Sequence, residues 1–104
     1  MISSVLAVSL LLAQQLPAAA QRQQFADCLR ALVNANVNAS IAEPEFTTLL
    51  AAACTEQEAA YRTAYVAAAV RGGDSRAMAQ SDADLEVEDL RTNFLELFRT
   101  ARTQ

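Results

Sequence analysis

The sequence predicts an all-α protein: a small antiparallel three-helix bundle with one disulfide joining its first two helices, preceded by a signal peptide. Alanine is abundant while valine, isoleucine and aromatic residues are sparse, and this mixture favours helices over sheets. Apolar residues recur at steps of three and four along three segments, which is the period of a helix face. No linker or internal repeat divides the 104-residue chain, so we expect residues 21–104 to form one domain.

Residues 1–20 have the layout of a secretory signal peptide. An apolar run at 5–13 is followed by a proline and three alanines, and Ala18 and Ala20 supply the small side chains of a cleavage site. The run is shorter than the roughly 20 residues of a membrane-spanning helix. We therefore expect removal after Ala20, with retention as an amphipathic or anchoring segment as the alternative. The remaining domain is expected to be periplasmic or secreted, without stable membrane insertion.

The first helix is expected over about 21–39 and the second over about 44–71. The boundary lies at Pro44, because the residue before a proline is pushed out of the helical region and proline suits a first helical turn. The Gly72-Gly73 pair can take the positive φ that closes a helix. The second helix has two apolar stripes on roughly opposite faces, which predicts that it lies between the other two. The apolar face of the first helix is formed by Phe25, Leu29, Leu32, Val33 and Val37.

The third helix is expected over about 75–102, beginning near either Ser75 or Ser81, and it has the most regular apolar stripe. Ser81 with Asp84 is similar to a capping box. Leu85 and Leu95 lie off the stripe and are expected to be exposed. The stripe consists of Ala83, Val87, Leu90, Phe94, Leu97, Phe98 and Ala101.

Cys28 and Cys54 are the only cysteines, and their spacing fits a hairpin between the first two helices. In an antiparallel pair centred on the Ser40–Glu43 break, the two cysteines face each other. An exported protein with two facing cysteines is expected to form one structural disulfide. A redox-active pair is the rival interpretation, but it usually shows a Cys-x-x-Cys motif, which is absent.

The composition argues against several functional classes. Without histidine there can be no Ser-His-Asp or Cys-His catalytic set and no histidine-containing zinc or haem site. The net charge of −4 disfavours nucleic acid as a partner, because nucleic acid binding needs clustered cations. We therefore expect no enzyme activity, no catalytic residue, no metal and no cofactor.

Three features could suggest a site, and each has a simpler structural interpretation. The acidic alternation at 82–89 is similar to the first ligands of a calcium-binding EF-hand loop, but Val87 stands where that loop needs glycine, which favours a solvated helix start. Neighbouring Glu43 and Glu45 fit the first turn of a helix better than a catalytic pair. The last feature is a pair of tyrosines one turn apart, Tyr61 and Tyr65, which we interpret as core and rim.

In size, helical content and single disulfide, the chain resembles periplasmic acid-stress chaperones of the HdeA type. It departs from them in that its cysteines bracket one hairpin and lysine is absent. No functional residue is carried over. The expected function is a non-catalytic envelope protein that binds another envelope protein or itself. An acid or stress chaperone is the alternative, because acidification would discharge twelve acidic residues while eight arginines stay charged.

Overall fold

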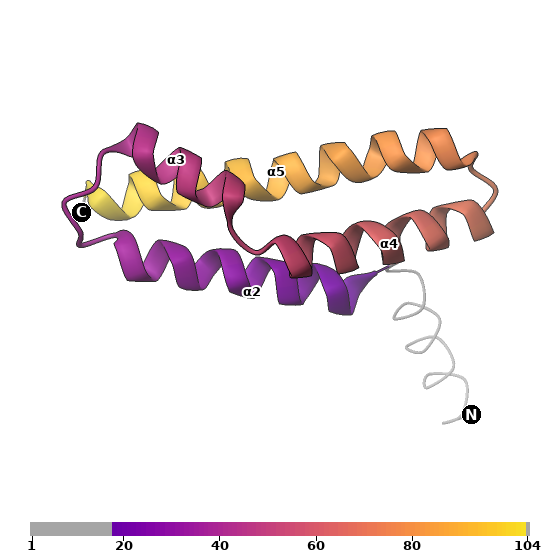
Figure 1. Ribbon diagram of the computed structural model, residues 1–104, viewed down its shortest axis with the longest axis horizontal. Coiled ribbons are helices and arrows are strands. Elements are labelled where there is room, and N and C mark those ends of the chain that lie inside the picture. Colours follow the sequence, from indigo (N-terminus) through magenta and orange to yellow (C-terminus); the bar gives the residue numbers. More distant parts are fainter. Residues whose placement is uncertain (1–17, 104) are drawn as a thin grey trace, which may run out of the picture.

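The computed structural model describes residues 18–103, and this range is entirely helical apart from short connections and ends (Figure 1). The all-α class is confirmed, but the described chain has four helices where the sequence predicts three. Residues 1–17 of the expected signal peptide lie outside the described residues. Ala18 is half-buried directly before the first described helix, and Ala20 is exposed in its first turn. The helices are α2 (Ala19–Asn36), α3 (Glu43–Ala52), α4 (Thr55–Arg71) and α5 (Arg76–Arg102).

The additional helix arises because the expected 44–71 helix is broken at Ala53 and Cys54. Ala53 is extended (φ −88°, ψ 159°) and Cys54 is left-handed (φ 62°, ψ 36°). A left-handed residue other than glycine costs about 1–2 kcal/mol, and no glycine or proline marks the position. The break is therefore set by tertiary contacts, and it lets α3 place Phe46 and Leu50 in the core beside α5. Sequence periodicity does not detect it.

The other helix ends follow local signals in the sequence. Ser75 caps α5, because its side-chain oxygen accepts a hydrogen bond from the backbone N–H of Met78 at 3.1 Å. The helix therefore begins at Arg76 directly after the Ser75 cap, and Ser81 lies inside it. Gly73 takes the positive φ (112°) that follows the end of α4, as expected for the glycine pair. The first helix ends at Asn36, three residues earlier than predicted.

The central helix is α5, whose 27 residues contact all three other described helices. This corrects the expectation that the second helix lies between its neighbours. Along α5, the predicted stripe is buried except at Leu97, which is 43% exposed, and at half-buried Ala101. The rings of Phe46 and Phe98 stack with centroids 3.8 Å apart. The main core contains Phe25, Ala26, Leu29, Val33, Phe46, Leu50, Tyr61, Val87, Leu90, Phe94 and Phe98.

At the opposite end from the α2–α3 connection, α4 and α5 extend past the other described helices as a two-helix hairpin (Figure 1). A second small core lies there, made of Val66, Ala79 and Ala83. Its residues are small, so this end buries little apolar volume. Among residues 18–103, no helix combines the length and apolar character that crossing a membrane requires.

Candidate functional site

Cys28 and Cys54 form a disulfide, with their Cα atoms 6.1 Å apart. Cys28 lies in α2, and Cys54 is the residue immediately before α4, so the bond ties α2 to the α3–α4 break. This differs from the predicted arrangement, in which the two cysteines face each other along two unbroken helices. Both residues are half-buried.

The guanidinium group of Arg91, on α5, lies against the same break. Its Nε and Nη2 donate to the backbone carbonyls of Leu50 and Ala53, both at 3.1 Å, and so satisfy acceptors at the end of α3. Its Nη1 lies 2.6 Å from Oε1 of Glu58 on α4. The group also lies 5.2 Å from the ring centroid of Phe25 on α2, a cation–π distance. Arg91 thus contacts every other described helix.

Glu58 sits between two arginines. In addition to Arg91, it accepts a hydrogen bond from Nε of Arg62 at 2.8 Å. Burial by itself would raise the pKa of the Glu58 carboxyl, but the hydrogen bonds and positive charges of both arginines outweigh burial and lower this pKa. Arg62 also pairs with Asp84 on α5. The network therefore holds α4 and α5 together through paired charges.

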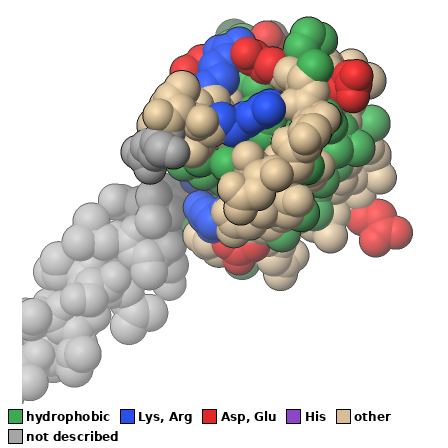
Figure 2. All heavy atoms as spheres, turned by 90° about the vertical axis from the view of Figure 1, so that its left-hand side faces the viewer, with side chains coloured by type: hydrophobic (Ala, Val, Ile, Leu, Met, Phe, Trp, Pro, Cys, Tyr) green, Lys and Arg blue, Asp and Glu red, His purple; other side chains and the backbone are tan. Residues whose placement is uncertain are grey.

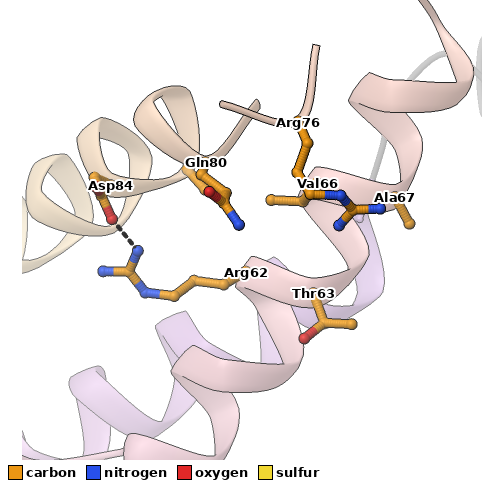
Figure 3. Close-up of a pocket in the computed structure, with 8 residues that line it drawn as sticks. Arg62, Thr63, Val66, Ala67, Arg76, Gln80 and Asp84 are labelled. Atoms are coloured by element: carbon orange, nitrogen blue, oxygen red, sulfur yellow. Dashed lines mark hydrogen bonds and ion pairs between the residues drawn. The ribbon is translucent and has the colours of Figure 1, made fainter. Parts of the chain in front are cut away.

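Two hollows follow α5, one on each side of the Arg62–Asp84 pair. The larger, of about 560 Å³, lies between α4 and α5 on the two-helix hairpin (Figure 3). Apolar atoms of Val66, Ala67 and Ala83 line it together with polar side chains. The second hollow, of about 360 Å³, runs between α3 and α5 past half-buried Leu95. Volumes of this order are typical of ligand pockets, but both hollows are open to solvent.

Charges of both signs are mixed on the end of the molecule that carries the α2–α3 connection. Figure 2 shows acidic and basic side chains interspersed there, around apolar ones. Arg99 on α5 pairs with Glu43 at the start of α3, and Arg102 donates to the carbonyl of Ile41. This face therefore offers no single-sign patch to a charged partner.

The remaining features of the sequence analysis lie in regular structure. Glu43 and Glu45 are in the first turn of α3, as interpreted from the sequence. Residues 82–89 are helical throughout, and within the described part of the chain no three acidic or cysteine side chains gather to hold a metal ion. Tyr61 is buried and donates to Glu86 at 3.3 Å. Leu85 is exposed as predicted, whereas Leu95 is half-buried against the core.

Sequence reasoning missed Arg91. The only local signal is its position beside Leu90, at the edge of the buried stripe, which is an ordinary place for an arginine. Its acceptors on Leu50 and Ala53 are 41 and 38 residues away in the chain, so the pattern within α5 does not reveal them. No family model, curated protein or solved structure matches the chain.

Proposed function

We propose that the chain is an exported, non-catalytic helical protein that acts by binding another envelope protein or a second copy of itself. Residues 1–20 have the pattern of a signal peptide, and the half-buried disulfide suits an oxidising compartment such as the periplasm. The chain has no histidine, and the disulfide leaves no free thiol among the described residues. Binding is therefore better supported than catalysis.

The observation that carries this proposal is the open hollow on the α4–α5 hairpin. Two helices alone bury only one side of each other, and helical bundles usually complete their core with a third or fourth helix. Here Val66, Ala67 and Ala83 line an open hollow of about 560 Å³ together with polar side chains. A helical partner, including the same hairpin of a second copy, would cover that hollow.

The experiment places a charge in the hollow and a matched charge outside it. Ala67→Glu adds a carboxylate at an exposed position that lines the hollow, and Ala60→Glu adds one at an exposed position of α4 that does not. Light scattering after size exclusion measures self-association, and crosslinking in the native envelope measures binding to another protein. We expect Ala67→Glu to weaken whichever complex forms and Ala60→Glu to leave it intact. Equal behaviour of both variants, or a monomer with no crosslinked partner, would contradict the proposal.

An acid-stress chaperone is the second candidate, and the position of Glu58 favours it. Protonation of this one carboxyl would leave Arg62 and Arg91 close together without their shared counter-charge. The resulting repulsion would loosen α4 from α5 and expose the apolar stripe of α5. Because eight arginines keep their charge in acid, the opened chain would be strongly cationic and would remain soluble with a bound client.

This candidate is tested with a client enzyme that aggregates at about pH 3, where most carboxylates are protonated. The purified protein should keep the client in solution at that pH and lose this ability after neutralisation. No protection over a tenfold range of protein concentration would remove the chaperone function. It would leave the binding proposal untouched, because that proposal concerns neutral pH.

A further inference from the structure

The two hollows beside α5 form one groove, which we call the α5 groove. Arg62 and Asp84 line both hollows, so the hollows meet at this ion pair and lie on the same side of α5 (Figure 3). Along α5, the lining residues run from Arg76 to Leu95. At 1.5 Å per residue this stretch is roughly 28 Å long, which is enough to hold a helix of about five turns.

The α5 groove carries opposite charges that lack partners. Arg76, the first residue of α5, and Glu88, in the middle of the same helix, both line the groove and are exposed. Neither residue forms an ion pair within residues 18–103. Between them lie Gln80, an amide donor, and Asp84, whose side chain is 69% exposed and so can accept a further hydrogen bond beside its pair with Arg62.

These four side chains are placed symmetrically about residue 82. Arg76 and Glu88 are equally far from it in the sequence, and so are Gln80 and Asp84. If two α5 helices lie antiparallel and cross at residue 82, Arg76 faces Glu88 of the second copy, and Gln80 faces its Asp84. A two-fold axis repeats each contact, so one patch on the chain is complementary to itself, as a symmetric dimer interface requires.

We propose that a second copy of this chain occupies the α5 groove, in a symmetric dimer whose α5 helices are antiparallel and cross at residue 82. This inference rests on the proposed binding function and names the partner. The contact covers the hollow on the α4–α5 hairpin, and the charges fix the register of the two helices. An unrelated helix would need an acidic and a basic residue at matching positions, whereas a second copy already carries both.

Charge reversal tests this register. Arg76→Glu or Glu88→Arg alone would place like charges opposite each other at two equivalent positions, and we expect either to raise the dimer Kd by about tenfold or more. The double variant Arg76→Glu with Glu88→Arg restores opposite charges and should return the Kd close to that of the parent. Sedimentation equilibrium of the oxidised protein at low salt, where surface charges are least screened, measures the Kd.

The controls make the same charge changes outside the groove. Arg71→Glu and Asp89→Arg alter exposed residues that do not line it, and the Kd should not change. Circular dichroism should show every variant folded, since a glutamate suits the first turn of α5. Single reversals without effect, or a double variant no tighter than the single ones, would overturn the register.

A strictly monomeric parent would overturn the dimer itself. If that monomer were crosslinked to another envelope protein, and Ala67→Glu abolished the crosslink, the proposed binding function would stand while the second copy would be excluded as the partner. If no complex of either kind formed, both proposals would fail.

Discussion

At the residue scale, the guanidinium group of Arg91 contacts three helices other than its own. It donates to the carbonyls of Leu50 in α3 and of Ala53 just after it, pairs with Glu58 of α4 and lies over the ring of Phe25 in α2. Its side chain is 16% exposed, so these contacts are poorly solvated and each is stronger than it would be in water. Removing the group leaves two carbonyl acceptors without their donor and leaves Glu58 with Arg62 alone.

We expect Arg91→Met, which keeps much of the side-chain volume, to lower the free energy of unfolding by about 2–4 kcal/mol. Urea denaturation at neutral pH measures the difference. Arg71→Ala, at an exposed position near the end of α4, is the control and should change stability by less than about 0.5 kcal/mol. Equal effects of the two substitutions would show that Arg91 behaves as an ordinary surface arginine.

At the element scale, some helix boundaries depend on neighbouring residues in the sequence, whereas others depend on contacts between distant parts of the chain. The stripe of α5 was predictable, because helix period depends on residues within one or two turns; its start was predicted near Ser75 or Ser81, and the cap is Ser75 rather than the Ser81–Asp84 box. The α3–α4 break was not predictable, because its determinants are a bond to Cys28 and contacts with Arg91 and Phe98, all distant in the chain. The cysteine pairing was predicted from hairpin spacing, although one of the two helices assumed is broken.

The packing of α3 on α5 can be measured through the stacked rings of Phe46 and Phe98. In a double-mutant cycle with Phe46→Leu and Phe98→Leu, we expect a coupling of about 0.5–1.5 kcal/mol, the usual range for aromatic pairs. Urea denaturation of the two single variants and the double variant supplies the cycle. Additive effects within error would show that α3 does not pack on α5 as described.

The disulfide closes a loop with a sequence separation of 26 residues. Replacing both cysteines with serine should lower the free energy of unfolding by about 2–4 kcal/mol, mainly because the unfolded chain is no longer constrained. Urea denaturation of oxidised parent and double variant gives the value. A variant as stable as the parent would mean that the bond contributes nothing to the fold.

At the scale of the whole molecule, acid should weaken the bundle through its interhelical ion pairs. The pKa of Glu58 is lowered in the folded chain, so its contribution to stability is present above the ordinary glutamate pKa and is lost as pH falls through the folded value. We expect the urea midpoint of the parent to fall steeply below about pH 4.5. Glu58→Gln should be less stable at neutral pH, and its deficit should shrink as the pH falls.

Glu56→Gln is the matched control, because Glu56 is exposed in the same turn of α4 and forms no ion pair among the described residues. It should follow the acid profile of the parent. If Glu58→Gln followed that profile too, the two-arginine site would have no part in acid sensitivity, and the observation favouring the chaperone candidate would be lost.

The proposed function requires that the protein is exported and that its two cysteines are oxidised. The pattern of residues 1–20 supports export, and the Cys28–Cys54 disulfide suits an oxidising compartment. The α4–α5 hairpin carries a hollow open to solvent, lined by apolar and polar side chains that a partner could cover. The proteins that could bind the α4–α5 hollow differ between the cell envelope and the cytoplasm. The compartment therefore decides which partners are relevant.

The intact mass of the protein recovered from the native cell envelope, measured without reductant, tests this account most directly. The expected mass is that of residues 21–104 less two hydrogens, which reports removal of residues 1–20 and the Cys28–Cys54 bond together. A mass that includes residues 1–20 would contradict the expected cleavage. A mass two hydrogens higher, with both thiols titratable in the folded protein, would contradict the disulfide on which the described fold depends.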